Sequence, residues 1–176
     1  MRKFLKILPL IVVLCAAASL PDDPFRGIQC DSDVIKTLTG RRFGNGTSSS
    51  LEKLHKDLGL KDLGGDEYSD LIFLGSWKIC DQEYMLLINT KRDIISDVLK
   101  VPEHTKKMPE FVGECEVNGV HKSGGIVAIL ENVAGKDLLP AKAAWKIDEK
   151  TNKFVPISTE GLRCARNGII TEDQEQ

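Results

Sequence analysis

The sequence contains three histidines, whose side chains are the best suited to proton transfer or metal binding near neutral pH. Glu52 and His55 form a Glu-x-x-His pair within residues 49–58, where leucines at intervals of three and four predict a helix. Carboxylate-bridged di-iron bundles use this pair on each of two helices, with further carboxylates from facing helices. This chain has one such pair, and both residues flank the leucine stripe. We therefore interpret them as a solvated polar face.

His104 and His121 lie in the polar stretches PEHTKK and VHKSGG, which predict loops. Neither has a partner at metal-ligand spacing, and the chain has no Gly-x-Ser-x-Gly motif. Catalytic groups assemble in space rather than in sequence. A small secreted hydrolase that uses His104 or His121 with a carboxylate is therefore an open alternative. It gains support if either histidine lines a concave pocket with an acid within hydrogen-bond reach.

Residues 64–68 have the sequence GGDEY, which resembles the Gly-Gly-Asp-Glu-Phe signature of diguanylate cyclases. The resemblance implies that Asp66 and Glu67 would help to hold a metal ion and a nucleotide. It covers these five residues alone, and the acidic metal-binding motif of that family is missing upstream. We interpret the segment as a connection between a helix and a strand, in which the two glycines provide the turn.

Four cysteines remain after residue 18, namely Cys30, Cys80, Cys115 and Cys164. An even number in an exported chain predicts two disulfides, for which three connectivities are possible. The positions of Cys30 and Cys164 near the chain ends favour a bridge between them, which leaves Cys80 to pair with Cys115. The chain has no Cys-x-x-Cys motif and no paired Cys or His spacing. We expect no metal and no cofactor.

Residues 1–18 have the features of a secretory signal peptide: three basic residues, then an apolar run that ends in small residues. The run is shorter than the about 20 residues that a membrane span needs. The alternatives are a bacterial lipoprotein acylated at Cys15, although Leu14 stands where a small residue is usual, and an uncleaved anchor. We expect a periplasmic or secreted protein with no stable membrane span after cleavage.

Cleavage would leave 158 residues, and three of the 24 basic residues would be lost with the signal. The remaining 21 basic and 26 acidic residues give a net charge of −5. Nucleic-acid binding relies on clustered Lys and Arg, so this charge argues against a nucleic-acid partner.

The remaining pattern predicts an α+β domain, with short N-terminal helices followed by a mainly antiparallel sheet of about six or seven strands. We expect an extended arm at residues 19–32, a single domain at residues 33–168 and a disordered acidic tail at residues 169–176. Residues 94–101 fit both a helix and a strand, and their setting between strand-like segments favours the strand. The sequence leaves the oligomeric state open.

Every candidate catalytic motif in the sequence is incomplete, whereas export and disulfides are well supported. The leading hypothesis is a non-catalytic binding or interaction protein of the cell envelope. Its partner would be another envelope or secreted protein.

Overall fold

The computed structural model describes residues 23–44 and 46–166, apart from the side chains of residues 122–124. The expected signal peptide, Cys15, the beginning of the arm and the acidic tail from residue 169 lie outside the described residues. Two short helices come first, α1 (Val34–Leu38) and α2 (Ser48–Leu54), followed by the 3-10 turn η1 (Lys56–Leu58).

Nine strands follow in the described part of the chain, and all the pairings between them are antiparallel. The first four form one sheet in the order of the sequence: β1 (Lys61–Ser69), β2 (Ile72–Ile79), β3 (Gln82–Asn89) and β4 (Ile94–Lys100). The other five are β5 (Glu110–Val117), β6 (Val120–Leu130), β7 (Leu138–Asp148), β8 (Lys153–Pro156) and β9 (Leu162–Ala165).

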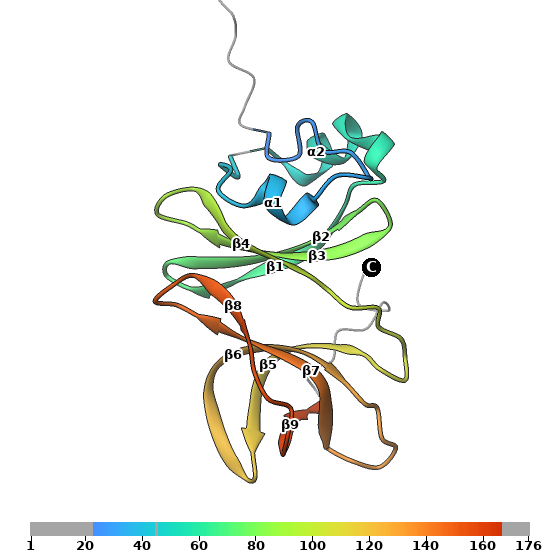
Figure 1. The fold of residues 1–176 in the computed structure, drawn as a ribbon, viewed down its shortest axis with the longest axis vertical. Coiled ribbons are helices and arrows are strands. Elements are labelled where there is room, and N and C mark those ends of the chain that lie inside the picture. Colours follow the sequence, from blue (N-terminus) through green and yellow to red (C-terminus); the bar gives the residue numbers. More distant parts are fainter. Residues whose placement is uncertain (1–22, 45, 167–176) are drawn as a thin grey trace, which may run out of the picture.

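The second sheet closes on itself. Its strands follow the order β6-β5-β9-β7-β8, and β6 also pairs with β7. Strands β5, β6, β7 and β9 therefore form a small closed ring, which we call the barrel. Strand β8 extends from β7 toward the four-stranded sheet (Figure 1).

The molecule is layered, with the helices on one face of the four-stranded sheet and the barrel on the other (Figure 1). Both faces of this sheet are apolar because its side chains alternate between two cores. In β2, Trp77 and Ile79 join the core under the helices, whereas Ile72 and Leu74 join the core shared with the barrel. A third core fills the barrel itself.

The fold agrees in part with the α+β expectation: antiparallel strands and few helices are confirmed. The single sheet of six or seven strands is replaced by two sheets, one of them closed. The strand at residues 94–101 is confirmed as β4, and the second half of β6 is covered on both faces. Its Ile126 faces the barrel core, whereas Val127 faces the core between the layers.

The GGDEY segment is part of β1 rather than a connection between a helix and a strand. Gly64 has a φ of +101° at a register shift between β1 and β2. A side chain at Gly65 would lie 2.6 Å from both the Phe73 ring and the Leu74 carbonyl oxygen. The two glycines therefore allow a bulged strand to pack closely, a role that composition does not distinguish from a turn.

The second helix is shorter than residues 49–58. It ends at Leu54, which is 64% exposed instead of lying on an apolar stripe. Leu51 and Leu58 are buried as expected. Two residues of the expected arm, Phe25 and Ile28, are buried in the core under the helices.

Two disulfides are present, but they join Cys30 to Cys80 and Cys115 to Cys164. This differs from the pairing that the chain-end positions favoured. Each bridge lies within one half of the fold: Cys115 and Cys164 are direct partners on β5 and β9, and Cys80 follows β2 in the first sheet. Proximity in the fold, rather than a position near the chain ends, decides the pairing. Such bridges fit an oxidising extracellular environment.

Candidate functional site

All three histidines of the chain pair with a carboxylate. His55 Nε2 lies 2.8 Å from an Asp23 oxygen, and His104 Nε2 lies 2.8 Å from Glu83 Oε2. His121 Nε2 lies 3.0 Å from Glu114 Oε2. The three pairs differ in burial and in setting, and these differences separate structural pairs from candidate sites.

The Glu52 and His55 side chains are not a solvated face. The Glu52 carboxylate accepts a hydrogen bond from the Asp62 backbone N–H at 2.8 Å, which links α2 to β1. The His55 side chain is 12% exposed and packs edge-on against the Phe25 ring. Both side chains therefore help to hold the N-terminal segments in place.

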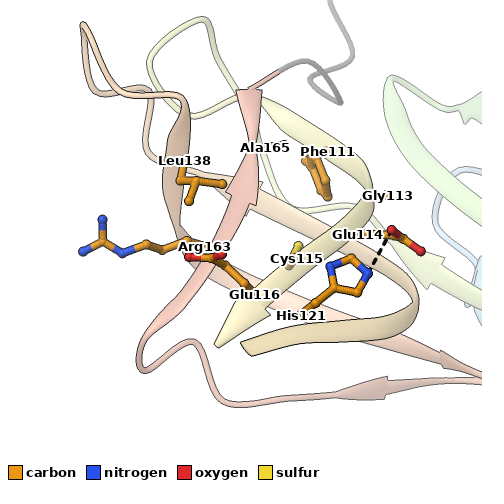
Figure 2. Close-up of a pocket in the computed structure, with 9 residues that line it drawn as sticks. All are labelled: Phe111, Gly113, Glu114, Cys115, Glu116, His121, Leu138, Arg163 and Ala165. Atoms are coloured by element: carbon orange, nitrogen blue, oxygen red, sulfur yellow. Dashed lines mark ion pairs between the residues drawn. The ribbon is translucent and has the colours of Figure 1, made fainter. Parts of the chain in front are cut away.

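His121 lines a hollow of about 420 Å³ on the barrel. The hollow combines charged and apolar side chains over strands β5, β6, β7 and β9. Its lining residues are Phe111, Gly113, Glu114, Cys115, Glu116, His121, Leu138, Arg163 and Ala165. In Figure 2 the His121 ring points toward Glu114, and the Arg163 side chain extends away from that pair. The pair is open to water, because the His121 and Glu114 side chains are 64% and 65% exposed.

A tight hairpin places His121 among these carboxylates. Asn118 and Gly119 both have positive φ and join β5 to β6 directly. The hairpin register sets Glu116 opposite His121. Glu114 lies two residues farther along the same face, within diagonal reach of the histidine. The Asn-Gly pair is therefore the sequence signal that could have placed His121 beside two acidic residues.

His104 belongs to a second group, at the passage from the four-stranded sheet to the barrel. It lies between Glu83 of β3 and Glu110, the first residue of β5, and His104 Nε2 is 3.8 Å from Glu110 Oε2. One ligand atom from each residue lies within 4.8 Å of the other two. Among the described residues this is the one group of three or more potential ligand side chains with such proximity.

Glu110 is the most buried member of this group, with a side chain 6% exposed. Burial raises its pKa to about 7, against the lowering effect of His104 and with a smaller raising effect of Glu83. Its Oε1 atom is buried and has no hydrogen-bond partner. A buried carboxylate oxygen without a donor costs free energy, and a proton or a cation on the carboxylate reduces that cost.

The segment that carries His104 is fixed at both ends by backbone hydrogen bonds. At one end the Val101 N–H donates to the Glu83 carbonyl at 3.0 Å. At the other end the Leu130 N–H donates to the Pro109 carbonyl at 2.9 Å, and the Asn132 N–H donates to the Lys107 carbonyl at 2.8 Å. His104 is therefore held against β3 by its neighbours and does not lie on an open loop.

The acidic residues of the GGDEY segment do not converge on a site. Asp66 and Glu67 are both exposed on β1, and the Asp66 carboxylate accepts a hydrogen bond from the Glu67 backbone N–H. Neither belongs to the potential metal-ligand group of the described residues. The arrangement that a cyclase site requires is not formed by these side chains.

Comparison with known proteins gives no match to a protein-family model, a curated protein or a solved structure. Among the described helices, none combines the length and apolar character needed to span a membrane. The chemistry of the chain's own residues is therefore the basis for a function.

Proposed function

We propose that this protein is an exported, non-catalytic binding domain of the cell envelope, which holds another exported protein at the hollow around His121. The observation that carries the proposal is the lining of this hollow. The lining combines two carboxylates, an imidazole and a guanidinium with the exposed apolar side chain of Leu138. Such a mixture of apolar contact and oriented polar groups is typical of recognition sites.

The strands that form the hollow are held in place by a disulfide and a tight turn, which favours binding. Cys115 lines the hollow and is joined to Cys164 on the neighbouring strand, while the Asn118-Gly119 turn fixes the β5–β6 hairpin. A surface that is already ordered loses little conformational entropy when a partner binds.

The described contacts of the histidines include no serine-type hydrolytic triad. Among the side chains that the structure describes, no serine or threonine hydroxyl is hydrogen-bonded to His104 or His121. Cys115, the cysteine of the hollow, is oxidised and is not a nucleophile. A histidine–carboxylate pair that contacts no hydroxyl among the described side chains lacks the nucleophile of a serine-type triad.

Site-specific crosslinking in the native host tests the proposal. A photoreactive benzoylphenylalanine at Leu138 should form a covalent adduct with one exported protein. Leu54 is the matched control, because it is an equally large, exposed apolar residue on α2, in the helical layer. Arg163→Glu should reduce the Leu138 adduct. No adduct at Leu138, or the same adducts from both positions, would contradict the proposal.

A hydrolase that uses His121 and Glu114 is the second candidate, favoured by their 3.0 Å contact within the hollow. Chromogenic ester, phosphoester, glycoside and peptide substrates should be offered to the wild type and to His121→Ala and His104→Ala. Turnover that disappears in one variant would replace the binding proposal. Absence of turnover is the result we expect.

A further inference from the structure

The group formed by Glu83, His104 and Glu110 lies apart from the hollow and is not used by the proposed function. Its members come from three separate segments: β3, the connection to the barrel, and the first position of β5. The spacing of the residues in the sequence therefore gave no indication of it. Their ligand atoms nevertheless lie within 4.8 Å of one another.

An independent observation points to a ligand at this group. The Glu110 side chain is 94% buried, and its Oε1 atom has no hydrogen-bond partner. Its other oxygen lies 3.8 Å from the His104 imidazole, beyond hydrogen-bond distance. A buried carboxylate normally has its oxygens satisfied by donors or by a cation.

We propose that Glu83, His104 and Glu110 bind one Zn²⁺ ion, with water as the fourth ligand. Two carboxylate oxygens and one imidazole nitrogen are ordinary zinc ligands. Zinc bonds of about 2.0 to 2.2 Å place tetrahedral ligand atoms about 3.3 Å apart. The present separations of 2.8 Å and 3.8 Å from His104 Nε2 require side-chain adjustments of less than about 1 Å to reach that value.

Charge and exposure also fit this ion. Two carboxylates balance the charge of one divalent cation, which makes its burial beside Glu110 acceptable. Glu83 and His104 are 30% and 25% exposed, so water can reach the open coordination position. Calcium and magnesium favour sites made of oxygen ligands alone, and the imidazole selects against them.

The bound ion would join the four-stranded sheet to the barrel. Glu83 belongs to the former, Glu110 to the latter, and His104 to the segment between them. Binding to the native state stabilises it against unfolding, because the three segments separate in the unfolded chain. The inference is independent of the partner that the hollow binds.

Isothermal titration calorimetry with zinc tests the site directly. The mature chain is used without a histidine tag, with both disulfides formed and after removal of metals with a chelator. We expect one zinc per chain and a rise in the unfolding temperature. Loss of an outer-shell partner of a metal site already costs about 10- to 100-fold in affinity. His104→Ala should therefore weaken binding by at least about 100-fold.

Glu110→Gln is the second variant, because the amide keeps the size of the side chain and removes the charge. It too should lose zinc affinity while it retains the fold. His121→Ala is the matched control, since it removes a histidine–glutamate pair outside the group. Zinc affinity should be unchanged in this control.

X-ray absorption at the zinc edge distinguishes this site from adventitious binding. The spectrum should show one histidine nitrogen, oxygen ligands and no sulfur. The absence of saturable binding would overturn the proposal, as would equal affinity in His104→Ala. The crosslinking experiment on the hollow is repeated in the native host with His104→Ala, which removes a proposed zinc ligand, so failure of either proposal is recognised separately.

Discussion

Glu110 is the residue whose burial has the clearest energetic consequence. In the metal-free protein its folded-state pKa of about 7 lies above the ordinary glutamate pKa of 4.5. Burial is the main cause, and the charged neighbours that face it are His104 and Glu83. Between these two values the native state holds a proton that the unfolded state releases. Stability therefore falls as the pH rises from about 4.5 to 7, and the penalty is complete above pH 7.

With a chelator present, Glu110→Gln should remove this pH dependence. The penalty amounts to at most about 3 kcal/mol, so the variant should be more stable than the wild type at pH 8 by up to that amount. Urea unfolding at pH 5 and pH 8 measures the difference. Glu103→Gln is the control, since Glu103 is an exposed glutamate on the same connecting segment. Identical slopes in the wild type and Glu110→Gln would contradict the assignment.

Tyr68, the last residue of the GGDEY segment, has a structural role. Its hydroxyl oxygen accepts a hydrogen bond from the Gly125 backbone N–H at 2.7 Å, which joins β1 to β6. Gly125 is buried, and it lies in the part of β6 where the pairing with β5 is interrupted. The tyrosine therefore satisfies an N–H group at a gap in the ladder.

Tyr68→Phe should reduce the free energy of unfolding by about 1 to 3 kcal/mol, because it leaves the buried N–H without this acceptor. Chemical denaturation measures the loss, and amide hydrogen exchange at Gly125 should accelerate. Tyr84→Phe provides a comparison, since Tyr84 is a buried tyrosine of β3 that belongs to the core under the helices. Unchanged exchange at Gly125 in Tyr68→Phe would contradict this role.

Polar contacts join strand β8 to the four-stranded sheet, and Lys153 Nζ donates one of them to the Ser96 carbonyl oxygen at 3.1 Å. Asp97 of β4 accepts a hydrogen bond from the Phe154 backbone N–H at 2.9 Å and pairs with Lys153 Nζ at 3.1 Å. Its side chain is 18% exposed, whereas that of Lys153 is 47% exposed. The backbone hydrogen bond is thus the better protected of the two contacts.

Asp97→Ala should cost about 1 to 3 kcal/mol of stability, because the Phe154 N–H loses its acceptor. Lys153→Ala should cost less than about 1 kcal/mol, because exposed ion pairs contribute little. Thermal and urea unfolding of both variants tests which one loses more stability. The double variant measures the coupling between the two residues. Equal losses in the two single variants would show that the ion pair, not the backbone contact, holds β8.

The sequence predicted the presence of strands better than it predicted how the strands pair. Apolar patterning predicted a mainly antiparallel arrangement of strands and favoured a strand at the ambiguous residues 94–101. Strand β1 was missed because its side chains are mostly polar and its glycines resemble a turn. Closure of the barrel depends on the β6–β7 and β5–β9 pairings, which no local pattern encodes.

The two candidate sites also differ in how far the sequence could predict them. The Asn118-Gly119 pair would have placed His121 opposite Glu116, because such turns fix hairpin register. Nothing local relates Glu83 to Glu110, since they become neighbours only when the barrel packs against the sheet. Sites within one hairpin can be predicted from sequence, whereas sites between layers require the fold.

For the whole molecule, the two disulfides divide the chain into two separately bridged halves. They join residues 50 and 49 positions apart, and closing loops of this length stabilises a protein by about 4 kcal/mol in the chain-entropy account. Replacing Cys115 and Cys164 together by alanine should cost about 2 to 5 kcal/mol. Urea unfolding measures this loss.

Peptide mapping without reduction is the control for the connectivity. Proteolysis should release one peptide pair that contains Cys30 and Cys80, and another that contains Cys115 and Cys164. A peptide pair that links Cys30 to Cys164 would contradict the structure.

The bulged first strand has a consequence for solubility. As an edge strand of the sheet, β1 presents backbone groups to which a second chain could add and begin an aggregate. Its two register shifts interrupt the regular ladder, and the exposed charges of Lys61, Asp66 and Glu67 lie along it. These are the features by which natural sheets discourage edge-to-edge association. The stretch with the letters of a nucleotide-binding motif therefore carries features that disfavour pairing with the edge of a second chain.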